Sequence, residues 1–114
     1  MKSLKSLNLK DNEIKAIEEL KQIIMGSYPD AEIILFGSKA RGDYSEDSDI
    51  DILILLDTEV NSKLKERIIG DIYDIELKYE ILFGPLIINK NDWNKDYKGN
   101  PFLKENIIRE GMFI

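Results

Sequence analysis

The chain has 114 residues with neither cysteine nor histidine, and its 22 acidic and 16 basic side chains give a formal charge of −6. This composition excludes disulfides, thiolate catalysis, histidine-based triads and ordinary zinc sites, and its negative charge disfavours binding to free nucleic acid. Because no apolar stretch is long enough for a membrane span or a signal peptide, we expect one cytoplasmic domain over residues 1–114, with 1–10 as its only linker-like segment.

Apolar periodicity predicts three helices and three strands. In chain order these are a helix, two strands, a helix, a strand and a last helix, at about 11–26, 31–36, 49–56, 60–78, 79–88 and 100–111. Asn100 and Pro101 suit the cap and first position of the last helix, and Gly111 suits its end. This order indicates an α+β fold around a small sheet.

A glycine-serine turn follows the first predicted strand. Gly37 has no Cβ, so its backbone can approach a ligand closely, and Ser38 adds a hydroxyl and a free amide. Successive amides in such a turn form an anion site, and Arg41 can hold phosphate oxygens in pairs. The turn alone is a weak signal, because Gly-Ser turns commonly end strands for purely structural reasons.

Two aspartates lie at the start of the second predicted strand. The two-residue repeat of a strand places Asp49 and Asp51 on one face, with Cα atoms about 6.5 Å apart. Carboxylates at this spacing can bind divalent cations that assist displacement at phosphorus, whereas without a metal they would repel each other. The alternative is a polar turn followed by Asp51 on a solvated face. The Gly-Ser turn ten residues upstream favours the metal site, and oxygen ligands suit Mg²⁺ or Mn²⁺.

The two segments 37–42 and 48–52 together resemble the signature of DNA polymerase β-like nucleotidyltransferases, and more narrowly of the minimal nucleotidyltransferases (MNT). Segments 79–86 and 101–103 extend this resemblance over most of the chain. It implies a small mixed β-sheet with helices packed on one face. It also implies that Gly37 and Ser38 bind the phosphates of a nucleotide such as ATP, and that Asp49 and Asp51 bind Mg²⁺.

The family resemblance also implies a third acid from a neighbouring strand, and the candidates are Asp74, Glu76 and Glu80. The first two are expected on the last turns of the helix over 60–78. Glu80 falls in the apolar run predicted as a strand, so we expect it to complete a second Mg²⁺ site and to take the acceptor proton. The alternative is that Glu80 is a charge that protects an edge strand from aggregation.

We expect one domain with no addition that could hold an acceptor, and we therefore expect a partner to supply the acceptor site. MNT proteins are frequently antitoxins of HEPN-type ribonuclease toxins, and the resemblance therefore implies transfer of AMP from ATP to a toxin tyrosine. Two alternatives stay open. The chain could be a small-molecule nucleotidyltransferase that works as a homodimer, or a non-catalytic antitoxin that binds and occludes its partner.

Overall fold

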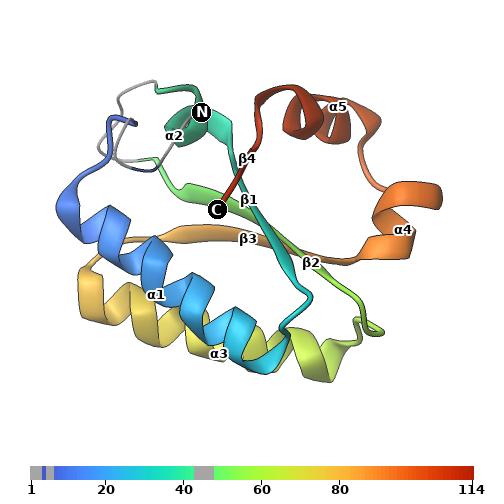
Figure 1. Ribbon diagram of the computed structural model, residues 1–114, viewed down its shortest axis with the longest axis horizontal. Helices are drawn as coiled ribbons and strands as arrows, with labels where there is room; N and C mark the ends of the chain where they lie inside the picture. The colour runs from blue at the N-terminus through green and yellow to red at the C-terminus, as the bar shows by residue number, and fades with distance from the viewer. Residues whose placement is uncertain (1–3, 5–6, 43–47) are drawn as a thin grey trace.

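The computed structural model describes residue 4 and residues 7–42 and 48–114, and it confirms the α+β fold with a small mixed sheet (Figure 1). The elements in chain order are α1 (Asp11–Ser27), β1 (Glu32–Phe36), α2 (Gly37–Arg41), β2 (Ile50–Leu56), α3 (Ser62–Tyr79), β3 (Phe83–Asn89), α4 (Lys90–Lys95), α5 (Pro101–Glu110) and β4 (Met112–Phe113). In the described part of the chain, no helix is long and apolar enough to cross a membrane.

The four strands form one sheet in the order β3-β2-β1-β4. β1 is antiparallel to both β2 and β4, whereas β2 and β3 are parallel and are joined through α3. A parallel pair needs such a long crossover, because the chain must return to the same end of the sheet. The register places Asp51 between Phe36 of β1 and Gly84 of β3.

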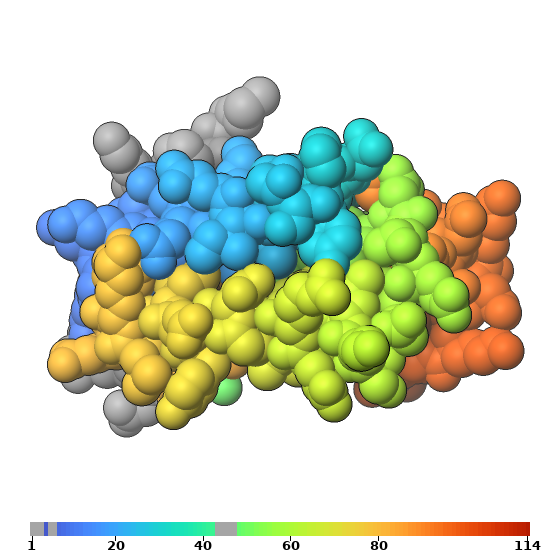
Figure 2. All heavy atoms as spheres, turned by 90° about the horizontal axis from the view of Figure 1, so that it is seen from below, coloured from blue at the N-terminus to red at the C-terminus, as the bar shows by residue number. Residues whose placement is uncertain are grey.

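One face of the sheet is covered by α1 and α3, which lie side by side (Figure 2). Their inward residues recur every three or four positions, the spacing of one helical face. These helices and the facing strand residues form the main core, whose largest fully buried side chains include Ile17, Leu20, Ile24, Leu35, Ile50, Ile52, Ile54, Ile68 and Ile72. This core fixes the position of every strand in the sheet.

The opposite face carries α4 and α5, which add a second and smaller core. Ile34, Leu53 and Leu55 of the sheet pack there with Trp93 of α4 and Ile107 of α5. The sequence predicted helices on one face of the sheet, whereas in the structure helices cover part of both faces. The second core lies toward the end of β2 that is remote from Asp51.

The prediction of a strand from residue 79 is wrong for its first four residues, because β3 begins only at Phe83. α3 continues to Tyr79, and Glu80 is its C-cap with left-handed backbone angles (φ 55°, ψ 46°). The helical spacing of the buried Ile68, Ile72 and Ile75 reaches Tyr79, which packs against the core. A continuous apolar run can belong to a helix end or to a buried strand, and here the helix takes its start.

Candidate active site

Asp49 and Asp51 lie where β2 begins. Ile50 and Ile52 point into the main core beneath α1 and α3, so the alternation of the strand directs Asp51 toward the opposite face, which also carries Leu53. Asp49 immediately precedes the strand and has the same parity as Asp51. The structure therefore brings the two predicted carboxylates to one side of the sheet.

The carboxylate of Asp51 lies against two residues that have no side chain. A Cβ at Gly37 would lie 2.2 Å from Asp51 Oδ2, and a Cβ at Gly84 would lie 2.8 Å from Asp51 Oδ1. Gly37 also has φ of +77°, a conformation that other residues rarely adopt. Both glycines are therefore required if the carboxylate is to occupy this place beside the turn.

The electrostatic environment of Asp51 favours a cation. Burial raises the pKa of the Asp51 carboxyl above its ordinary value, the negative charge of Asp49 raises it further, and Arg41 partly opposes this rise. Two adjacent carboxylates, one of them partly desolvated, make a ligand set that suits a hard divalent ion such as Mg²⁺. The donor chemistry thus fits the metal that the family resemblance implies.

The turn after β1 forms the short helix α2, which contains the other predicted nucleotide-binding residues. The hydroxyl of Ser38 donates to the hydroxyl oxygen of Ser48 at 3.3 Å, which links this turn to the segment just before Asp49. Arg41 donates from Nη1 to Glu110 Oε2 of α5 at 2.9 Å. This hydrogen bond holds the pKa of Glu110 below its ordinary value.

A buried ion pair attaches α2 to α1. Lys39 Nζ lies 2.9 Å from Glu13 Oε2, and the two side chains are only 5% and 9% exposed. The backbone N–H of Lys10 also donates to Glu13 Oε1 at 2.9 Å. Since a buried charge is costly without its partner, this pair holds the turn containing Gly37 firmly against the first turn of α1. The sequence analysis did not identify this pair, because residues 26 positions apart show no local pattern.

Glu80 is not where the sequence placed it. As the C-cap of α3 it is exposed, and its left-handed backbone does not continue into β3. The argument that made it a strand acid pointing toward Asp49 and Asp51 therefore fails. Within residues 7–42 and 48–114 no group of three or more acidic side chains is placed to hold a metal ion. The strand position beside Asp51 belongs instead to Gly84.

Asp74 and Glu76 lie on α3, as predicted, and Glu76 has a structural task there. Its Oε2 accepts a hydrogen bond from the backbone N–H of Phe83 at 2.8 Å, which fixes the first residue of β3. Because Gly84 follows directly and abuts Asp51, Glu76 helps to position the strand that borders the carboxylate. Glu76 thus supports the site indirectly.

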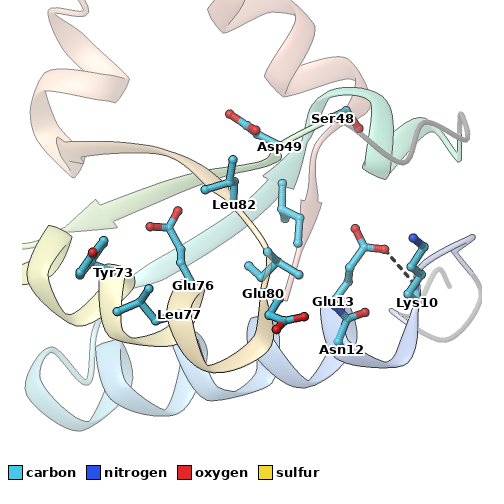
Figure 3. A pocket seen from close by; sticks show the side chains of 12 residues that line it. Lys10, Asn12, Glu13, Ser48, Asp49, Tyr73, Glu76, Leu77, Glu80 and Leu82 are labelled. Carbon is cyan, nitrogen blue, oxygen red and sulfur yellow. Dashed lines mark hydrogen bonds between the residues drawn. The ribbon is translucent and has the colours of Figure 1, made fainter.

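An open cavity of about 470 Å³ includes Asp49, but not Asp51, among the residues that line it (Figure 3). Its walls come from the N-terminal end of α1, the C-terminal half of α3 and the segments that precede β2 and β3. Asp49 lies on its rim together with Leu82, and Glu76, Leu77 and Tyr73 approach it from α3. The arrangement can admit a molecule to Asp49 from the side of α3.

Gly84 is the functional residue that sequence reasoning missed. The sequence analysis covers Gly84 only as part of the segment 79–86 and gives it no separate role. A usable signal was available, because a glycine at the start of a strand often marks the close approach of another group. Identifying that group as Asp51 required the parallel register of β2 and β3.

Comparison with known proteins identifies the family of the chain. A family model for the nucleotidyltransferase domain matches residues 14–114. Two relatives in Methanocaldococcus jannaschii are each named "Putative protein adenylyltransferase". One is 44% identical over 79 residues, covering 68% of this chain and 80% of the relative. The other is 37% identical over 105 residues, covering 90% and 98%.

A solved structure described as a toxin-antitoxin with AMP-PNP shares the fold. It superposes with a TM-score of 0.57 at 16% identity, over 91% of this chain and 72% of that one. The family match spans both the turn at Gly37 and the aspartates, and the second relative extends it over most of the chain. The chain therefore belongs to the nucleotidyltransferase domain family and is a nucleotidyltransferase.

Proposed function

We propose that this protein transfers AMP from ATP to a hydroxyl group of a partner protein. The observation that carries the proposal is the pairing of Asp49 and Asp51 beside the Gly37 turn, in a nucleotidyltransferase whose relatives bear the name of protein adenylyltransferases. The structural neighbour described with AMP-PNP supports a nucleoside triphosphate as the donor. The proposal includes action in the cytoplasm, where ATP is available.

Each residue of the site has a proposed task. Gly37 and Ser38 would bind the triphosphate through their backbone and hydroxyl groups, and Arg41 would exchange Glu110 for phosphate oxygens. Asp49 and Asp51 would hold Mg²⁺, which when bound supplies charge neutralisation at the phosphates. The acceptor oxygen would form a bond to the α-phosphorus as the bond to pyrophosphate breaks, and the hydroxyl proton would be released to solvent.

We propose a HEPN-type toxin as the partner and a tyrosine as the acceptor, which makes the protein an antitoxin. The neighbour described as a toxin-antitoxin shares the fold and so supports the plausibility of this assembly. The formal charge of −6 also suits a basic protein surface better than a nucleic-acid backbone. A partner that brings its own tyrosine needs no additional domain in this chain.

The test is a labelling reaction. The purified protein is incubated with Mg²⁺ and an extract of its source cell, with α-labelled and γ-labelled ATP in parallel and with Asp49→Asn as the control. We expect label from the α position only, on one protein band, with at least a hundredfold loss in Asp49→Asn because metal assistance is worth several kcal/mol. Peptide mapping of the labelled band then identifies the acceptor residue.

Other outcomes would contradict the proposal in defined ways. Label that depends on Asp49 but appears on a small molecule would indicate the homodimeric small-molecule enzyme. The absence of any label that depends on Asp49, with each of the four nucleoside triphosphates, would indicate an antitoxin that acts by occlusion. In that case Asp49→Asn would still neutralise the toxin.

A further inference from the structure

Four large apolar side chains are exposed along the outer side of α3 and just beyond it. Ile69, Tyr73 and Leu77 are 49%, 57% and 62% exposed, and Leu82 before β3 is 63% exposed. The first three follow one another at intervals of four residues, so they project from one side of the helix. We call these four residues the α3 face.

The α3 face is separate from the side of the helix that forms the core. The buried positions of α3 are Ile68, Ile72 and Ile75, and they pack beneath the sheet beside α1. The core of the fold therefore does not account for the exposed residues. Figure 2 shows the surface of α3 open beside α1, so the helix can accept a partner without rearrangement.

The α3 face leads directly to the candidate active site. Tyr73, Leu77 and Leu82 all line the cavity whose rim includes Asp49 (Figure 3). Leu82 lies two residues before Gly84, which borders the Asp51 carboxylate. The carbonyl of Leu82 accepts a hydrogen bond from the N–H of Ile50 at 2.9 Å. A molecule seated on this face would thus approach the site at Asp49, which of the two aspartates is the one that lines the cavity.

The charge around the α3 face is negative. Helical geometry places Glu66 on the same side of the helix as Tyr73, with Asp74 on one flank and Lys65 on the other. Glu80, the C-cap, lines the cavity together with Tyr73 and Leu77. Among the described residues, none of these three acids has an ion-pair partner. The cation Lys78 lies instead at the boundary with α1, where it pairs with Glu19 at 2.7 Å.

We propose that the α3 face docks the acceptor protein, and that the docked segment is a helix with apolar side chains flanked by lysine or arginine. This inference rests on the proposed transfer to a protein hydroxyl and identifies the surface that delivers it. Ile69 to Leu77 spans about 12 Å, roughly two helical turns, which suits a short helix lying in contact with α3. The acceptor hydroxyl would enter the cavity beyond Leu82 and approach Asp49.

A second exposed apolar group provides the matched control. Phe102 and Ile108 on α5 are 73% and 69% exposed, and neither lines the cavity that reaches Asp49. Glu105 is an exposed acid on the same helix. If apolar exposure or negative charge alone attracted the acceptor, changes on α5 would matter as much as changes on α3.

The experiment compares two double variants of α3 with one double and one single variant of α5. Tyr73→Ser with Leu77→Ser removes apolar anchors, and Glu66→Lys with Glu80→Lys reverses the charge. The controls are Phe102→Ser with Ile108→Ser, and Glu105→Lys. The acceptor protein identified by α-labelling is purified, and its transfer rate is measured at increasing acceptor concentration. Binding of Mg·ATP, followed by calorimetry, and the melting temperature report on the site and on folding.

We expect both α3 variants to raise the KM for the acceptor by at least about tenfold, while the KM for ATP and the melting temperature are unchanged. The α5 variants should behave as the unmodified protein. The same ranking is expected when each of these changes is combined with Asp49→Asn and binding of the purified acceptor is measured. The Asp49→Asn background allows docking to be measured without transfer. Charge reversal should also make docking less sensitive to salt.

Three outcomes that would contradict the proposal are distinguishable. If the unmodified protein labels the acceptor and the α3 variants do so with an unchanged KM, the docking surface is overturned while the proposed function stands. If the unmodified protein labels no protein in a manner that depends on Asp49, the proposed function fails and the acceptor-docking surface fails with it. An equal rise in the acceptor KM of the α3 and α5 variants would show that docking is not specific to the α3 face.

Discussion

The two ends of β2 lie on the same sheet but are built for different purposes. At its far end Leu53 and Leu55 are buried with Trp93 and Ile107 in the second core. At its near end Asp51 occupies the same face, and its carboxylate lies against Gly37 and Gly84, which have no side chains, although its register partner on β1 is Phe36. The candidate site at one end of β2 thus depends on two positions without side chains, whereas the other end depends on close packing of large ones.

The largest effect expected from this comparison is on stability, at the far end. Leu53 is fully buried, so Leu53→Ala should lower the free energy of unfolding by about 3 kcal/mol through lost transfer energy and a residual cavity. Chemical denaturation measures this change. Transfer by the folded fraction should be retained, because Asp49 and Asp51 are untouched.

The control for this variant is Ile108→Ala, at a residue that is 69% exposed. It should change the free energy of unfolding by less than about 0.5 kcal/mol. If Leu53→Ala abolished transfer while the protein stayed folded, the two ends of β2 would be coupled. The conclusion that the far end contributes to stability alone would then be wrong.

An intermediate effect is expected at the near end, from Gly84→Ala. The added Cβ would meet Asp51 Oδ1 at 2.8 Å, so the carboxylate must shift. We expect transfer to fall about tenfold, equivalent to about 1.4 kcal/mol, with a weaker response to added Mg²⁺. Titration of transfer activity with Mg²⁺ measures both changes.

Gly70→Ala is the matched control for that glycine. Gly70 lies within α3, and a Cβ there would meet nothing within 4 Å. The variant should keep its transfer activity. Its free energy of unfolding should rise by up to about 1 kcal/mol, because alanine is the better helix former. Equal losses of activity in the two variants would show that Gly84 has no special relation to Asp51.

The elements that sequence patterns predicted well are those with a strong local signal. Asn100 accepts from the N–H of Phe102 as the N-cap of α5, as predicted. The pairing of Asp49 and Asp51 also followed from a local rule, the two-residue repeat of a strand. Local chemistry was sufficient in each of these places.

The features that escaped prediction depend on tertiary structure. The boundary at Glu80 was misplaced because apolar residues at 79–83 satisfy both helix and strand patterns, and only packing of Tyr79 on the core decides between them. The Arg41–Glu110 pair joins α2 to α5 across 69 positions, and no short-range pattern contains it. The slot around Asp51 likewise needs the register of three strands.

The smallest effect concerns the charge of Asp51 itself. Its pKa is raised in the folded protein, chiefly by burial and then by Asp49, so the folded state binds this proton more tightly than the unfolded state. The contribution of Asp51 to stability is therefore present below its ordinary pKa of 3.8 and declines as the pH rises through its raised value. Asp51→Asn removes that decline.

In buffer with EDTA, Asp51→Asn should melt at a higher temperature than the unmodified protein at pH 7, and the difference should vanish as the pH falls below about 4. Added Mg²⁺ should raise the melting temperature of the unmodified protein but not that of Asp51→Asn, because an ion bound only by the folded state stabilises it. Asp57→Asn, an exposed position just after the far end of β2, should show neither effect. A lower melting temperature for Asp51→Asn in EDTA at pH 7 would mean that hydrogen-bond donors already stabilise the ionised carboxylate. The near end of β2 would then be an ordinary polar strand end, with no need for a cation.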